Sequence, residues 1–240
     1  MTPLLEVLDV TKMFGAVRSL SDVTFAVAEH RIVGVIGPNG AGKSTLINVL
    51  SGVYGPTLGS VRFEGRDIAA LPTAERARIG LVRTFQRPAP IADLSCIEGV
   101  MLGGLVRGLS IAEARREAAG KLELLGLADI AGQAPRKLPT GRLKLLDFAR
   151  VLMLHPKLVL LDELMAGLSA SELDTVLRAI EGLADDGVHF VVIEHLMDVI
   201  KRLSRHLIVM DAGRIVSAGD PAVVIRDPQV IMAYLGEEAA

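Results

Sequence analysis

Short apolar segments alternate along the chain with polar or glycine-rich turns, and most of them have the length of a β-strand. Their branched residues predict strands over residues 5–10, 23–27, 31–36, 60–63, 81–85, 158–162, 188–194, 206–210 and 214–217. Apolar residues recur at helical spacing near residues 43–51, directly after one of these strands. Strands that alternate with helices are typical of parallel βαβ units, so we expect an α/β fold.

The pattern becomes helical between residues 88 and 154. Ser110-Ile-Ala-Glu113 has the form of a capping box, apolar residues follow it at helical spacing, and Gly126 ends them. A second capping box, Ser169-Ala-Ser-Glu172, follows the strand at 158–162. We therefore expect a helical subdomain over 88–154, inserted into a core formed by 1–87 and 155–240.

Composition narrows the class of protein. Half of the 240 residues are hydrophobic, which is ample for a buried core, and the net charge of -2 offers no basic surface for nucleic acid. The longest apolar runs have strand length and fall far short of the roughly 20 residues of a transmembrane helix. The N-terminus lacks the features of a secretory signal, and a single cysteine, Cys96, excludes an internal disulfide framework. We expect a cytoplasmic protein in which Cys96 is a small apolar residue.

The segment Gly-Pro-Asn-Gly-Ala-Gly-Lys-Ser-Thr over residues 37–45 matches the phosphate-binding P-loop at every position. It joins the strand at 31–36 to the helix near 43–51, so that loop N–H groups and the positive end of the helix dipole can meet phosphate oxygens. Lys43 is expected to contact the β- and γ-phosphates, and the Ser44 hydroxyl to bind Mg²⁺. The predicted nucleotide-binding residues are Gly37, Pro38, Asn39, Gly40, Ala41, Gly42, Lys43, Ser44 and Thr45.

Two later strands end in residues that suit phosphoryl chemistry. The strand at 158–162 ends in Asp162 and is followed by Glu163. Strand ends present ligands in α/β sheets, so Asp162 is a candidate Mg²⁺ ligand and Glu163 a candidate base for the attacking water. His195 follows the strand at 188–194. By itself, a histidine at a strand end is more often structural than catalytic.

These spacings together resemble the ATP-binding subunit of an ABC transporter over essentially the whole chain. The resemblance implies one ABC ATPase domain over 1–240, a P-loop NTPase fold with a mixed β-sheet core, an antiparallel β segment and the inserted helical subdomain. It implies that Phe14 stacks on adenine, that Gln86 contributes to the Mg²⁺ site and that His195 contacts the γ-phosphate. Taken alone, Phe14 is better interpreted as an apolar anchor against the sheet, because aromatic residues are mostly in the core.

A narrower resemblance is carried by Arg83-Thr-Phe-Gln86, Ile193-Glu-His-Leu-Met197 and Ala233-Tyr-Leu-Gly236. These segments look like those of ATPases of importers for branched-chain amino acids and related amides or urea. This implies the cofactors ATP and Mg²⁺, dimerisation with a second ABC ATPase subunit, identical or related, and transmembrane permease subunits as partners, with no nucleic acid. It places the chain peripherally on the inner face of the cell membrane. Residues 88–105 would meet the permease, although their apolar side chains could equally pack in the interior.

The chain departs from the family pattern at the signature segment, which is usually Leu-Ser-Gly-Gly-Gln. Here it is Leu138-Pro-Thr-Gly-Arg142, in which proline removes a hydroxyl and a backbone N–H. Either the contact of Pro139, Thr140 and Gly141 with nucleotide is weakened, or Thr140 and Gly141 make it and Pro139 prepares a helix that starts near Leu143. A second departure, Leu164 in place of the usual proline, is expected to alter residues 166–169 modestly.

Two further function classes remain open from the residues. A weakened signature would suit an assembly module that binds ATP and dimerises with little hydrolysis, although Glu163 argues against it. An ABC protein acting on DNA or ribosomes would usually carry two ATPase halves or a coiled-coil insertion, and this sequence has neither.

Overall fold

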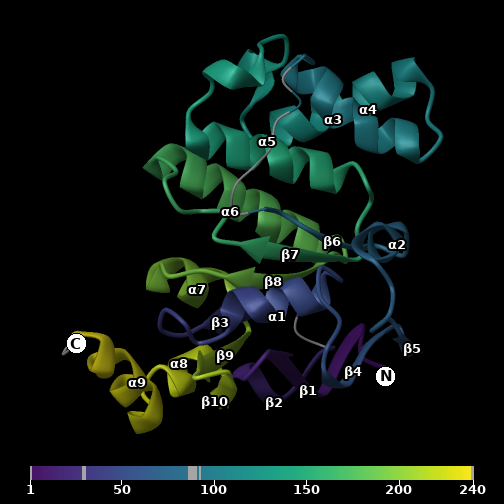
Figure 1. The fold of residues 1–240 in the computed structure, drawn as a ribbon. Helices are drawn as coiled ribbons and strands as arrows, with labels where there is room; N and C mark the ends of the chain where they lie inside the picture. The colour runs from purple at the N-terminus through teal and green to yellow at the C-terminus, as the bar shows by residue number, and fades with distance from the viewer. Residues whose placement is uncertain (1, 29–30, 86–90, 92, 239–240) are drawn as a thin grey trace. The chain divides into compact units, whose positions relative to one another are not determined.

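The computed structural model describes residues 2–28, 31–85, 91 and 93–238, and its contacts divide the chain into two compact units (Figure 1). Unit 1 comprises Met1–Arg76 and His189–Ala240, and unit 2 comprises Ala77–Val188. The predicted helical subdomain at 88–154 falls within unit 2, which also includes the strands and the helix on either side of it. Its exact limits stay a prediction.

One sheet of unit 1 is antiparallel and has the strand order β2-β1-β4-β5. Alternate residues of its first strand, among them Leu5 and Val7, are buried. The first two strands run further than the hydrophobic pattern predicts, because register shifts beyond Val7 interrupt the alternation while the pairing continues to Phe14 and Val17. The strands are β1 (Leu5–Phe14), β2 (Val17–Val27), β4 (Leu58–Phe63) and β5 (Arg66–Asp67).

The other strands of unit 1 have the order β10-β9-β3-β8, in which β3 runs parallel to both neighbours and β10 is antiparallel to β9. All five residues of β3 are buried, and Ile36 at its end joins a core cluster with Ile200, Leu207, Val209 and Val224. The strands are β3 (Ile32–Ile36), β8 (His189–Ile193), β9 (His206–Asp211) and β10 (Arg214–Gly219), and the helices are α1 (Lys43–Leu50), α7 (Met197–Leu203), α8 (Pro221–Val224) and α9 (Pro228–Glu238).

Arg76 secures the end of α1 from within unit 1. Its helix is α2 (Thr73–Arg78), and its side chain is fully buried. The guanidinium donates to the carbonyl oxygens of Val49 and Leu50, each at 2.7 Å. Burial lowers the pKa of Arg76 to about 10, against the nearby charge of Asp67, so the group is still protonated at neutral pH. One buried cation therefore satisfies carbonyls at the end of the helix that follows the P-loop.

Unit 2 combines two parallel strands with helices. Gly103 allows close helix packing, because a Cβ there would lie 2.7 Å from Cβ of Met153. The predicted capping boxes at Ser110 and Ser169 are confirmed, each with its N–H bonded to the glutamate three residues later. The elements are β6 (Leu81–Arg83), α3 (Cys96–Val106), α4 (Ile111–Leu124), the 3-10 turns Ala128–Ile130 and Pro135–Lys137, α5 (Thr140–Leu152), β7 (Leu158–Asp162) and α6 (Ala170–Asp185).

Two boundaries in unit 2 differ from the predictions. Strand β6 ends at Arg83 and not at residue 85, because the Phe85 N–H turns to the carboxylate of Asp147, at 3.1 Å. Helix α5 begins at Thr140 and not near Leu143. Pro139 is its N-cap with φ -58° and ψ 153°, a position where the helix needs no N–H from proline. Thr140 and Gly141 are therefore helical residues.

Candidate functional site

The P-loop lies between β3 and α1 in unit 1, and its three glycines have different surroundings. Gly37, Gly40 and Gly42 have φ values of 153°, 81° and 98°. A Cβ on Gly37 would overlap the carbonyl oxygen of Met210, and one on Gly42 would lie 2.7 Å from the carbonyl oxygen of Ser19. A Cβ on Gly40 would meet no described atom within 4 Å. The missing Cβ of Gly37 and Gly42 thus allows the loop to pack closely against neighbouring backbone. At Gly40 the loop has open space beside it.

Lys43 holds a positive charge inside this loop. Its side chain is 7% exposed, and Nζ donates to the carbonyl oxygens of Gly37 and Pro38 at 2.5 and 2.8 Å. Gly42, the N-cap of α1, has no side chain to cap the helix, and no acidic residue lies in the first turn. The amides at the start of α1 and its dipole therefore favour an anion beside Lys43.

The remaining loop residues divide between support and surface. Ala41 and Pro38 are buried, and the Ala41 carbonyl accepts a hydrogen bond from Gly213 N–H, at 3.1 Å, in the turn between β9 and β10. The Thr45 and Ser19 hydroxyl oxygens lie 2.7 Å apart, which ties α1 to β2. Asn39 and Ser44 are exposed. Ser44, the candidate Mg²⁺ ligand of the loop, therefore lies at its surface.

Phe14 lies at the end of β1 in an exposed aromatic cluster. Its side chain is 43% exposed, which excludes the core-anchor interpretation. The Tyr54 ring meets it edge to face at 5.2 Å between centroids, and Nζ of Lys12 lies 5.2 and 5.5 Å from the two ring centroids. Lys12 also donates to the Gly55 carbonyl oxygen at 2.8 Å. Two accessible rings and a cation form a surface on which a purine can stack.

The carboxylates of unit 2 lie at the end of β7. Asp162 is 5% exposed, and its Oδ2 is 3.2 Å from Nη2 of Arg83 on β6. Burial lowers the pKa of Arg83, while the nearby carboxylate of Asp162 opposes this shift. Glu163 follows with φ +50°, a left-handed conformation that residues other than glycine seldom adopt. Its side chain is half-buried.

His195 is exposed in unit 1, two residues beyond the end of β8. Gln86, the predicted glutamine-loop residue, lies outside the described residues. The roles of both remain predictions.

The signature segment opens α5. Pro139 and Thr140 are exposed, whereas Gly141 is buried and faces the loop at 166–169. A Cβ on Gly141 would lie 3.0 Å from the Gly167 carbonyl oxygen. The first turn of α5 therefore packs closely on the loop that follows Glu163.

Comparison with known proteins identifies relatives of the whole chain. The family model described as ABC transporter matches residues 20–166, and the model described as branched-chain amino acid ATP-binding cassette transporter matches residues 214–240. The high-affinity branched-chain amino acid transport ATP-binding protein BraF of Pseudomonas aeruginosa is 35% identical over 251 residues, which cover 98% of each chain.

Solved structures give the same result. A structure of the ADP conformation of an ATP-binding cassette of an ABC transporter has a TM-score of 0.86 and 31% identity, covering 98% of this chain and 100% of the other. A dimeric bacterial ABC transporter cassette has a TM-score of 0.83 and 25% identity, covering 90% and 98%. These matches confirm the predicted fold class.

The described residues include no helix that is both long and apolar enough to cross a membrane.

Proposed function

The chain belongs to the ABC transporter ATP-binding family, and we propose that it is the ATP-hydrolysing subunit of an importer for branched-chain amino acids or related small solutes. The observation that carries the ATPase assignment is the complete P-loop, with Lys43 held inside it and an uncapped helix start beside it. The match of residues 214–240 to the branched-chain model supports the solute class. The alternative of an assembly module with little hydrolysis finds no support among these relatives.

In this function the P-loop binds the phosphates of ATP and the exposed ring of Phe14 stacks on adenine. Ser44, Gln86 and Asp162 would hold Mg²⁺. The hydroxyl of the exposed Ser44 and the carboxylate of Asp162 fit this role, because Mg²⁺ prefers hard oxygen ligands. When bound, Mg²⁺ would supply positive charge that neutralises the charge developing on the phosphates.

Hydrolysis requires a base, and Glu163 is the residue we assign. Its carboxylate accepts the proton of a water molecule whose oxygen forms a bond to the γ-phosphorus, while the bond to the β-phosphate oxygen breaks and leaves ADP. His195 would donate to the γ-phosphate and stabilise its charge. Pro139, Thr140 and Gly141 would approach the nucleotide of a second ATPase subunit.

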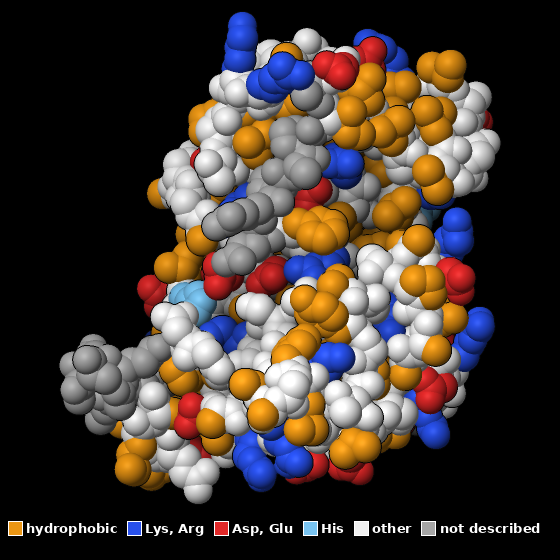
Figure 2. Space-filling model, in the orientation of Figure 1, with side chains coloured by type: hydrophobic (Ala, Val, Ile, Leu, Met, Phe, Trp, Pro, Cys, Tyr) orange, Lys and Arg blue, Asp and Glu red, His pale blue; other side chains and the backbone are white. Residues whose placement is uncertain are grey.

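A separate permease is the second partner that we propose, on the helical part of unit 2. Orange side chains gather over the region that α3 and α4 occupy (Figure 2). On these helices, Val106 is 76% and Ile111 71% exposed. A pocket lies beside α3 and α5, lined by residues that include Ile91, Cys96, Leu146 and Arg150. Binding there would place the chain on the inner face of the membrane.

Replacement of the assigned base tests the proposal. We expect Glu163→Gln to keep MgATP binding and to lose nearly all hydrolysis, because the amide cannot take the proton from water. Phosphate release measures turnover, and size-exclusion chromatography with MgATP should show a trapped dimer. Glu123→Gln on an exposed part of α4 is the matched control. Hydrolysis by Glu163→Gln at the parent rate would refute the assignment.

A further inference from the structure

Lys144 is a buried lysine on α5 that the roles assigned above do not use. Its side chain is 7% exposed, whereas lysine is rarely buried without compensating contacts. Nζ donates to the carbonyl oxygen of Glu163 at 2.6 Å and to that of Ala166 at 2.9 Å. Both acceptors are main-chain atoms of the loop that leaves β7. The cation is therefore directed at the backbone that carries the proposed base.

The backbone at Glu163 needs such support. Its φ of +50° is unfavourable for a residue with a Cβ, and conformations of this kind persist only where surrounding contacts enforce them. The hydrogen bond from Lys144 fixes the Glu163 carbonyl, and the orientation of this peptide sets the direction of the Cα–Cβ bond. A displacement of about 1 Å in a reacting group can lower the rate by about a hundredfold.

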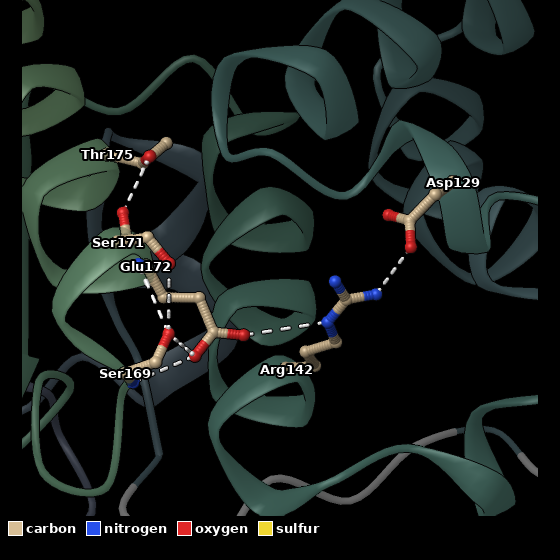
Figure 3. Close-up of polar contacts among 6 residues, drawn as sticks. All are labelled: Asp129, Arg142, Ser169, Ser171, Glu172 and Thr175. Atoms are coloured by element: carbon tan, nitrogen blue, oxygen red, sulfur yellow. Dashed lines mark hydrogen bonds and ion pairs between the residues drawn. The ribbon is translucent and has the colours of Figure 1, made fainter.

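The far end of the same loop is held by the same helix (Figure 3). Arg142 lies between two carboxylates, with Nη1 2.7 Å from Oδ2 of Asp129 and Nε 3.5 Å from Oε1 of Glu172. Oε2 of Glu172 accepts hydrogen bonds from Ser169 N and Oγ at 2.9 and 2.8 Å. Arg142 and Lys144 thus connect α5 to both ends of residues 163–169.

We propose that Lys144 is a positioning residue for ATP hydrolysis, which fixes the main chain of Glu163 and thereby the direction of its carboxylate. The inference rests on the proposed function of Glu163. The P-loop and Phe14, which are assigned to the phosphates and adenine of ATP, belong to unit 1, whereas Lys144 donates to the main-chain carbonyls of Glu163 and Ala166 in unit 2. The structure therefore assigns Lys144 to turnover and not to affinity.

The test compares Lys144→Met with Lys144→Arg in the full-length chain. We expect Lys144→Met to lower kcat at least about tenfold while KM for MgATP and Kd for a non-hydrolysable ATP analogue change less than about twofold. Lys144→Arg keeps a cationic donor and should recover most of kcat. Lys121→Met on α4 is the matched control, because Lys121 donates no described hydrogen bond to residues 163–172.

A double variant separates positioning from general damage to the fold. If Lys144 acts through the Glu163 carboxylate, adding Lys144→Met to Glu163→Gln should leave the residual rate unchanged. A further loss as large as in the single variant would overturn the inference. If Lys144→Met does not fold, Lys144→Gln replaces it, because glutamine keeps an N–H donor. We expect this variant to have an intermediate kcat. A parental kcat would contradict the proposal.

The two proposals fail in distinguishable ways. Parental turnover in Glu163→Gln would overturn the assignment of Glu163 as the base and this inference together. If Glu163→Gln is inactive but Lys144→Met has the parental kcat, only the role of Lys144 is overturned.

Discussion

Gly37 and Gly40 belong to one loop but face different surroundings. A methyl group on Gly37 would overlap the Met210 carbonyl, whereas one on Gly40 would enter open space. We expect Gly37→Ala to lower the free energy of unfolding by about 2 kcal/mol or more, as overpacking does, and Gly40→Ala by only about 1 kcal/mol from backbone strain. Gly40→Ala should nevertheless weaken ATP binding, since its methyl group would occupy the face available to phosphate.

Urea unfolding and calorimetric titration with ATP measure the two effects on the same proteins. A Gly40→Ala variant with parental ATP affinity would show that phosphate does not approach this face of the loop.

At the scale of single residues, the sequence predicts best where the chemistry is contiguous. The P-loop and the pair Asp162–Glu163 are short linear motifs, and the structure places them at strand ends as expected. Lys144 and Lys12 could not be assigned in this way, because each donates to a carbonyl far along the chain, 19 and 43 residues away. Contacts of this kind depend on tertiary structure, which leaves no local pattern.

At the scale of helices and strands, the first residue of a helix was predicted correctly where a side chain caps the backbone locally. The boxes at Ser110 and Ser169 begin α4 and α6 as predicted. The start of α5 was misplaced because Pro139 caps it through backbone conformation alone. Strand β1 was predicted too short because its register shifts break the alternation from which strands are recognised.

The capping box of α6 should make stability depend on pH. Hydrogen bonds from Ser169 N–H and hydroxyl hold the pKa of Glu172 below its ordinary value of 4.5. Since the folded pKa is below the unfolded one, the charge of Glu172 contributes stability that is fully present above about pH 4.5 and is lost as pH falls through the folded value.

We therefore expect the parent protein to exceed Glu172→Gln in free energy of unfolding by about 1 kcal/mol at pH 7, and the difference to shrink below about pH 4.5. Urea unfolding at a series of pH values gives the comparison, with Glu123→Gln as control. A difference that stays constant down to pH 3 would contradict this role of the charge.

On the scale of the whole molecule, charge gives little guidance to partners. The 26 basic and 28 acidic residues nearly balance, so partner recognition depends on local surfaces such as the exposed apolar side chains of α3 and α4. The fold class was predictable because motifs distributed over the whole chain had the spacing of one family. The limits of the two units were not, since they depend on contacts between distant segments.

Nucleotide should stabilise the whole chain through the P-loop. In the Glu163→Gln background, MgATP at 100 times its Kd should add about 2.7 kcal/mol to the free energy of unfolding, which corresponds to a rise in Tm of roughly 5–10 °C for a chain of this size. Adding Lys43→Ala should abolish most of the rise, because the phosphates lose their cation. Differential scanning calorimetry measures the rise in Tm. An equal rise in the Lys43→Ala variant would exclude this residue from ATP binding.

The left-handed backbone of Glu163 affects how this protein can be engineered. Glycine adopts a φ of +50° without the strain that a Cβ causes, so Glu163→Gly should match or exceed the parent in stability by up to about 1 kcal/mol. The Glu163 carbonyl that accepts from Lys144 belongs to the main chain and remains in such a variant. Directed evolution for heat resistance alone would thus favour loss of the proposed base, and a library screened for thermostability needs a turnover assay in every round.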